Sequence, residues 1–149
     1  MGNLVLVMLK SSGVSLEVFF LTLIFSIPLA LLICMGRMSK VKAISKITSF
    51  FLLVIRGTPL MLQLIFVYFA PPYIFGVGMQ RFTAAIVAMV INYACYFAEI
   101  YRGGIQAIPV GQYEASSVLG FTRPQTFFRI VLPQVIKKII PAMGNEVIT

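Results

Sequence analysis

The chain has 149 residues, of which 60% are hydrophobic and 11% are charged, with a mean hydropathy of +0.99 and a net charge of +8. Soluble domains are closer to half apolar and a quarter charged, so this composition indicates a membrane protein. The sequence has no histidine and no aspartate, which excludes the common catalytic triads, histidine-based metal sites and aspartate-held magnesium, and we expect no metal site.

Three apolar segments are long enough to cross a membrane as helices, at about residues 14–35, 49–70 and 82–100. The first would be about 33 Å long as a helix. It is too long for the core of a secretory signal, so we interpret it as a retained span. We expect the residues Gly57–Thr58–Pro59 to weaken the second span and Pro71–Pro72 to end it.

The lysines and arginines gather in the loops between the apolar segments. Four lie between the first two spans, and five follow the third span, whereas residues 73–80 are uncharged. By the positive-inside rule, both basic stretches face the cytoplasm and the N-terminus lies outside. Because these charges predict topology and not a basic binding face, we expect no nucleic-acid partner.

Residues 102–133 are rich in turn signals and follow the third span directly. The pattern favours a helix that ends at Gly120, since glycine accepts a left-handed backbone. Thr122 can cap a second helix with Pro124 in its first turn, and we expect Pro133 to interrupt that helix. These signals predict a helix-turn-helix elbow, which we call the elbow throughout.

The spacing within the elbow resembles the coupling loop of ATP-binding-cassette (ABC) importer permeases. The pattern reads Glu-Ala, four residues, Gly, nine residues, Ile-x-Leu-Pro, and it is formed by Glu114, Ala115, Gly120, Ile130, Leu132 and Pro133. The stretches AEIYRGGI (98–105), IPVGQ (108–112) and RGTP (56–59) make the resemblance closer to the polar amino-acid branch, from about residue 13 to 149. Ser116 departs from the family, which usually has a second alanine there, although a small residue is kept.

The resemblance implies an all-α integral membrane fold with three transmembrane helices and a cytoplasmic coupling elbow, truncated at the C-terminus relative to the family. It implies a permease subunit of an ATP-driven importer of polar amino acids in the bacterial cytoplasmic membrane. The implied partners are an ABC ATPase, a second permease copy or homologue, an extracytoplasmic amino-acid-binding protein and membrane lipid. No glycine is followed by lysine, so the GK[ST] phosphate loop is missing. ATP and magnesium are therefore expected on the separate ATPase, and this chain is not expected to be an enzyme.

Two sets of residues are candidates for function. The first set is implied for ATPase coupling. It combines a charge that could pair with Arg123 or Arg129, small residues for close approach, the turn glycine and apolar anchors. Its members are Glu114, Ala115, Ser116, Leu119, Gly120, Phe121, Ile130, Leu132 and Pro133. Polar side chains inside a membrane are costly and usually face the bundle interior. These side chains form the second set, a candidate substrate pathway of Arg56, Thr58, Gln63, Asn92 and Glu99.

Each set has an alternative interpretation. The pathway residues could instead form hydrogen bonds between helices, with Arg56 and Glu99 as a structural pair. In ideal straight helices, these two residues would differ by about 10 Å in their depth within the membrane. The elbow could be an interfacial amphipathic hairpin without a partner. For the whole chain, a truncated non-transporting scaffold or remnant stays open. A passive channel is less favoured, because no span carries a ring of like charges or a continuous polar face.

Overall fold

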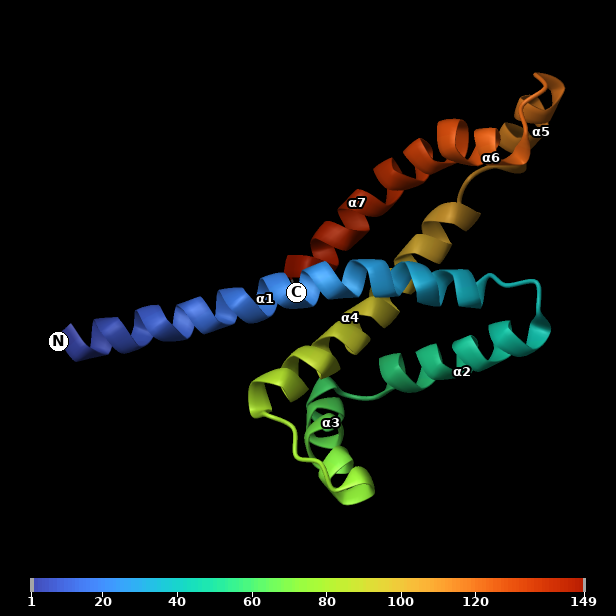
Figure 1. The fold of residues 1–149 in the computed structure, drawn as a ribbon. Coiled ribbons are helices and arrows are strands. Elements are labelled where there is room, and N and C mark those ends of the chain that lie inside the picture. Colours follow the sequence, from blue (N-terminus) through green and yellow to red (C-terminus); the bar gives the residue numbers. More distant parts are fainter. Residues whose placement is uncertain (1, 149) are drawn as a thin grey trace.

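The computed structural model describes residues 2–148, with side chains from residue 5 onward, and in this range the chain forms helices and no strand (Figure 1). The helices are α1 (Gly2–Arg37), α2 (Lys42–Gly57), α3 (Leu60–Phe75), α4 (Arg81–Gln106), α5 (Val110–Val118), α6 (Arg123–Thr126), the π-helical segment η1 (Phe127–Val131) and α7 (Leu132–Ile148). Residues 5–37 of α1 and the whole of α4 are each long and apolar enough to cross a membrane, and the bent pair α2–α3 could form a third span. The all-α membrane fold expected from the sequence is confirmed.

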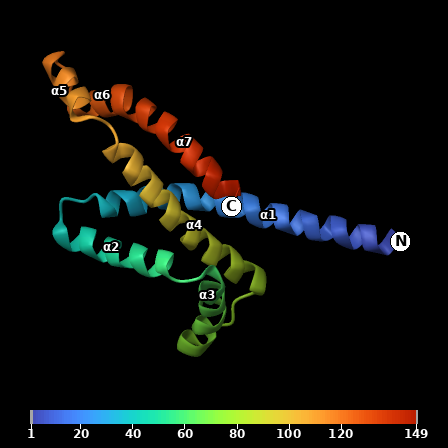
Figure 2. The ribbon, with the colours of Figure 1, turned by 180° about the vertical axis from the view of Figure 1, so that it is seen from behind.

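Helices α1 and α4 cross near the middle of the molecule and make its most extensive helix-to-helix contact (Figures 1 and 2). Small buried side chains lie at the crossing, with Ala30 and Cys34 on α1 and Ala94 and Ala98 on α4. Small residues allow helix backbones to approach closely, which is how membrane helices pack without a hydrophobic driving force between them. The crossing therefore forms the centre of the core.

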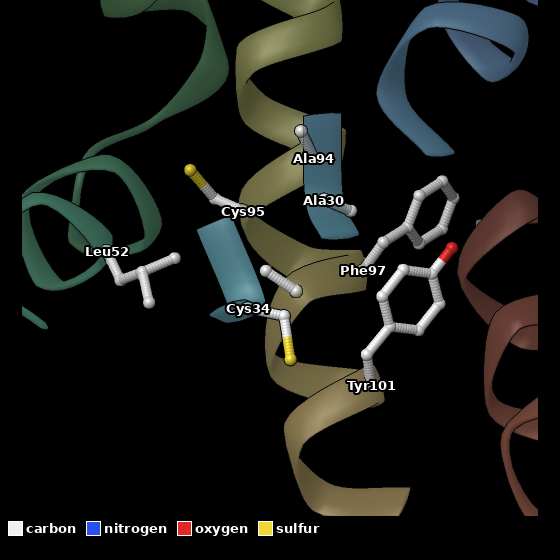
Figure 3. Close-up of a cluster of buried hydrophobic side chains, with 8 residues drawn as sticks. Ala30, Cys34, Leu52, Ala94, Cys95, Phe97 and Tyr101 are labelled. Atoms are coloured by element: carbon white, nitrogen blue, oxygen red, sulfur yellow. The ribbon is translucent and has the colours of Figure 1, made fainter. Parts of the chain in front are cut away.

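The other helices add to this centre from two sides. Figure 3 shows Leu52 of α2 on one side of α4, whereas Phe97 and Tyr101 point toward α7 on the other. Outside the core, most large apolar side chains of α1, α2 and α3 are exposed, as on a surface that faces lipid. α7 lies beside α4, and its C-terminal end lies beside the middle of α1 (Figures 1 and 2).

The second expected span, residues 49–70, is divided into two helices. α2 ends at Gly57, α3 begins at Leu60, and the two helices are bent by 109°. Pro59 explains this corner, because a proline disfavours helical backbone at the residue before it, and Thr58 is extended with φ −110° and ψ 143°. The weak point expected in this span is therefore a sharp break.

Prolines that were expected to end helices lie inside them. α3 continues through Pro71 and Pro72 to Phe75, and it ends at Gly76, whose φ of 67° lets its N–H bond to the Pro72 carbonyl at 3.0 Å. α7 likewise contains Pro141. Membrane helices tolerate proline because neighbouring groups satisfy the carbonyls that it leaves without a donor.

Pro133 does not interrupt the second arm of the elbow either. It is preceded by the five-residue π-helix η1, in which the N–H of Leu132 bonds to the carbonyl of Phe127, five residues back. The amide of Gln134 donates to the Ile130 carbonyl at 2.9 Å. The wider turn accommodates a residue that has no N–H and would crowd an α-helical turn. The backbone is consequently helical without a break from Arg123 to Ile148.

Candidate functional site

The elbow forms the tip of the molecule farthest from α3 and turns at Gly120 (Figure 1). Gly120 has φ +77°, and paired bonds close α5: Phe121 N–H to Ser116 O and Gly120 N–H to Ser117 O, both 3.0 Å. This pair of bonds around a left-handed glycine is the standard glycine helix stop. Across the turn, Thr122 and Gln125 form a capping box at the start of α6, with the Thr122 N–H bonded to Gln125 Oε1 at 2.9 Å. The helix-turn-helix expected around Gly120 is confirmed.

The elbow begins later than expected, because α4 does not end with its apolar span. Arg102, which was placed at the start of the elbow, lies within α4 and bonds to Glu99 and to Gln106 on the same helix surface. Side chains three and four residues apart on a helix are neighbours, so these bonds extend the helix to Gln106. The connection to α5 is therefore only residues 107–109.

The two arms of the elbow bury a small polar contact and expose an apolar tip. Ser116 is 2% exposed and faces α6, so it joins the arms and is not available to a partner. Val118, Leu119 and Phe128 are 88%, 73% and 65% exposed. Of the other candidate coupling residues, Glu114, Ala115, Gly120 and Pro133 are exposed, whereas Phe121, Ile130 and Leu132 are partly buried.

Glu114 does not pair with Arg123 or Arg129, because every salt bridge within the described range involves Glu99. Glu114 and Ser116 are two positions apart, so they project about 200° apart around α5. Since Ser116 faces α6, Glu114 points to the opposite, open side. The expected pair is therefore wrong, and the Glu114 carboxylate is exposed.

A buried polar network fastens the corner between α2 and α3 to α4. The Gln63 amide donates to the Ile55 carbonyl at 2.6 Å and to the Thr58 hydroxyl at 2.9 Å. Its oxygen accepts a bond of 2.9 Å from the amide of Asn92, and both amide side chains are buried. Gln63 and Asn92 thus serve helix-to-helix hydrogen bonding, and they hold Thr58 in place at the corner.

Glu99 is the meeting point of arginines from three helices. Arg102 of α4 donates two hydrogen bonds to Glu99 Oε2, at 2.7 Å and 3.0 Å. Arg37 of α1 lies 3.8 Å from Oε1, and Arg56 of α2 lies 4.0 Å from Oε2. The corner at Pro59 ends α2 beside α4, and straight spans would not place Arg56 there. The Arg56–Glu99 pair considered from the sequence therefore forms, although Arg102 takes the strong hydrogen bonds.

Arg56 is the least constrained of these arginines. Its side chain is 42% exposed, and its guanidinium lies over the ring of Tyr96, 5.0 Å from the ring centre. Such a cation–π contact orients the group and leaves its N–H donors open to a ligand. With three arginines around one carboxylate, this region carries excess positive charge.

An open cavity of about 550 Å³, which we call the Arg56 cavity, lies at the corner between α2 and α3. Its lining includes three of the candidate pathway residues together with two tyrosines and one acid, namely Arg56, Thr58, Asn92, Tyr93, Tyr96 and Glu146. Gln63 and Glu99 are outside the lining, and each contacts a residue within it. The cavity therefore has a cationic group on α2 and an anionic group on α7.

Residues 26–149 match the family described as the binding-protein-dependent transport system inner membrane component. The chain belongs to this family. It is accordingly a membrane protein, in agreement with the apolar helices that are long enough to span a bilayer.

Curated relatives of the chain are named as amino-acid permeases. The chain is 38% identical over 129 residues to the L-cystine transport system permease protein TcyB of Bacillus subtilis (strain 168), covering 87% of this chain and 55% of that protein. It is 38% identical over 141 residues to the arginine transport system permease protein ArtQ of the same organism, covering 95% and 64%. A putative glutamine transport system permease protein GlnP of Rickettsia felis is 33% identical over 144 residues, covering 97% and 66%. The chain thus spans 55–66% of the length of these relatives.

Two solved structures share the fold of this inner membrane component. A crystal structure described as an amino acid ABC transporter with histidines matches with a TM-score of 0.82 and 39% identity, covering 96% of this chain and 70% of that one. The inward-facing MetNI methionine ABC transporter matches with a TM-score of 0.63 over 91% of this chain and 64% of that one. Its identity of 22% makes it evidence for the fold alone.

Glu146 is the residue of this inner membrane component that the sequence did not identify as a candidate. α7 continues through Pro141 and carries Glu146 into the lining of the Arg56 cavity. The available signal was that the chain has only four acidic residues. A carboxylate near the end of an apolar helix is costly unless it faces a cavity or a polar group, and Glu146 faces a cavity that an arginine also lines.

Proposed function

We propose that the chain is the membrane-spanning permease subunit of an ATP-driven importer of polar amino acids. The observation that carries this proposal is the unbroken helix from Arg123 to Ile148. One end of this helix is an arm of the elbow, and the other end carries Glu146, which lines the Arg56 cavity. A partner that moves the elbow therefore also acts on the cavity.

The energy comes from a separate ABC ATPase, which binds ATP and magnesium. The tip of the elbow offers the ATPase an exposed apolar anchor in Leu119 and, in Glu114, a carboxylate that forms no salt bridge with the described residues. This arrangement requires the elbow to be on the cytoplasmic side, with the N-terminus outside, in a bacterial cytoplasmic membrane. Basic residues on the elbow side support this orientation. A second permease copy or homologue and an extracytoplasmic amino-acid-binding protein complete the importer, which is embedded in membrane lipid.

The Arg56 cavity takes the zwitterionic part of the substrate. The guanidinium of Arg56 pairs with the substrate carboxylate, and the carboxylate of Glu146 pairs with the ammonium group. Arg56 suits this role because Arg102 takes the hydrogen bonds of Glu99 and leaves the Arg56 donors open. Thr58 and Asn92 add neutral polar groups to the same lining.

Contacts between α4 and α7 support the coupling of the elbow to the cavity. Lys138 donates to the Ala107 carbonyl at 2.6 Å, and Gly104 lies against Ile139 so closely that no side chain fits between them. α7 is thus held against α4 along a fixed line. Displacement of the elbow therefore moves α4 and α7 together relative to α2 and changes the separation of Glu146 from Arg56, which opens the cavity to one side of the membrane at a time.

Co-purification with an ABC ATPase of the amino-acid-importer class tests the proposal. Glu114→Lys and Leu119→Asp should each abolish capture of the co-expressed ATPase and the stimulation of its hydrolysis by amino acid. Ile44→Lys is the matched control, because it adds a charge to an exposed basic stretch of α2, outside the elbow. If both elbow variants retain the ATPase and its coupling, the proposal is wrong.

A further inference from the structure

A narrower pocket lies beside the Arg56 cavity, between α1 and α4. Its volume is about 130 Å³, and residues of α1, α4 and the end of α7 line it. Ser26 and Phe97, both 0% exposed, form its deep end, and the exposed residue Ser15 is at its edge. We call it the Thr22 pocket, after the residue described next.

The hydroxyl of Thr22 in this pocket has no hydrogen-bond partner within the described part of the chain. Thr22 is 7% exposed, so solvent does not satisfy the hydroxyl either. Other helical hydroxyls bond back to their own helix, as Thr48 does to Ile44 at 2.9 Å and Ser26 does to Leu23 at 3.2 Å. Buried polar groups without a partner are rare, and each one calls for a missing partner. The lining position of Thr22 indicates that this partner lies in the pocket.

The Thr22 pocket and the Arg56 cavity share a wall. Tyr93 of α4 lines both, and the consecutive residues Glu146 and Val147 of α7 line one each. The two spaces therefore lie on neighbouring faces of α4. A ligand with its charged end between Arg56 and Glu146 can extend a short substituent past Tyr93 toward Thr22.

The lining of the Thr22 pocket restricts the chemistry of that substituent. The pocket contains hydroxyl groups and apolar side chains but no acid and no base, so a charged group would be buried without a counter-charge. An apolar cavity of about 150 Å³ holds benzene, so this slightly smaller pocket excludes a bicyclic ring. A purely apolar group would leave Thr22 without a partner.

We propose that Thr22 determines substrate specificity, and that its pocket receives a short, neutral, hydrogen-bonding side chain, a hydroxyl or an amide, of the amino acid in the Arg56 cavity. This inference rests on the proposed function and narrows its substrate class. The Arg56 cavity recognises what all amino acids share, whereas the Thr22 pocket selects among them.

Equilibrium binding of radiolabelled threonine and valine to the purified full chain in detergent tests the inference, since these two amino acids differ by a hydroxyl in place of a methyl group. The chain should bind threonine roughly three- to tenfold more tightly than valine, the range that one net hydrogen bond provides. Unlabelled glutamine should compete with threonine, and arginine and glutamate should compete much more weakly. Thr22→Val should bring the threonine-to-valine ratio close to one, and Thr22→Ser should keep it.

The matched control is Thr48→Val, which removes a hydroxyl of the same type outside both cavities. It should leave the ratio unchanged, and a monodisperse elution profile shows that each variant is folded. Equal binding of threonine and valine, an unchanged ratio in Thr22→Val, preferred binding of arginine or glutamate, or no binding at all would each overturn the inference. Selective binding without ATP-driven uptake by the assembled importer would instead contradict the proposed function alone.

Discussion

Thr126 donates a hydrogen bond of 3.0 Å to the hydroxyl of Ser116, and this bond joins the two arms of the elbow behind the turn at Gly120. Both side chains are buried, at 6% and 2% exposure, and Ser116 in turn donates to the Tyr113 carbonyl at 2.8 Å. The elbow is therefore braced internally, and its outer face is exposed. Ser116, which departs from the usual alanine of the family pattern, is the residue that makes this brace.

Removing half of the brace should destabilise the elbow. Ser116→Ala leaves the Thr126 hydroxyl buried without its acceptor, at a cost of about 1–2 kcal/mol. Ser116→Ala combined with Thr126→Val removes both hydroxyls, and its cost should be smaller than the sum of the single changes. Hydrogen exchange of the amides in α5 and α6 measures both effects. Strict additivity would show that the hydroxyls do not interact.

Gly120 should resist substitution because of its backbone, not because of crowding. Its φ of +77° is unfavourable for other residues, and no atom within 4 Å would contact an added Cβ. Gly120→Ala should therefore cost about 1–2 kcal/mol. Gly111→Ala, at an equally open position inside α5, should be neutral or stabilising by up to about 1 kcal/mol. Thermal unfolding in detergent compares the two variants, and equal effects would contradict the assigned turn.

Gly104 should be sensitive because of crowding. A Cβ at this position would overlap Ile139 and lie 3.3 Å from Val135, so Gly104→Ala forces α7 away from α4 at a cost of about 1–3 kcal/mol. Ile139→Ala should restore part of the lost stability in the double variant. Gly103→Ala is the matched control, since nothing lies within 4 Å of its Cβ position. If Gly104→Ala left the stability unchanged, α7 would not pack against α4 at Gly104.

Gln63 should stabilise the corner between α2 and α3 through its hydrogen bonds. Gln63→Leu removes the acceptor of Asn92 and the donor to Thr58, which should destabilise the chain by about 1–3 kcal/mol. Gln63→Leu with Asn92→Leu removes both ends of the interhelical bond and should be less damaging than the two separate costs suggest. Hydrogen exchange of the amides of residues 55–63 reports whether the corner stays packed against α4. Unchanged exchange in Gln63→Leu would contradict this role.

Arg56 and Glu146 should determine how strongly the amino-acid backbone groups of a substrate are held. Arg56→Gln and Glu146→Gln should each raise the KM of ATP-driven uptake by the assembled importer roughly tenfold or more, because each removes a charge-assisted contact. Arg81→Gln, at the start of α4 and outside the Arg56 cavity, is the control. An unchanged KM in both cavity variants would show that the substrate lies elsewhere.

Much of the local structure could be predicted from the residues, because short-range chemistry determines it. Apolar runs long enough for a bilayer predicted membrane helices, and Gly120 and Thr122 predicted where one arm of the elbow ends and the next begins. The prolines were less informative. Pro59 makes a corner, whereas Pro133 and Pro141 lie within a continuous helix, so the presence of a proline alone did not predict where a helix ends.

The sequence by itself determined the membrane class, the helical elbow and the family pattern, because these depend on composition and on residues within a few turns of one another. Only the tertiary structure decided that Arg56 meets Glu99, that Glu146 shares a cavity with Arg56, and that the Thr22 hydroxyl has no partner among the described residues. The physical reason is that each of these facts depends on how helices distant in the chain cross. Small residues such as Ala30 and Gly104 determine where these helices cross, because they let the helix backbones approach closely. Their own side chains contribute little to the contact.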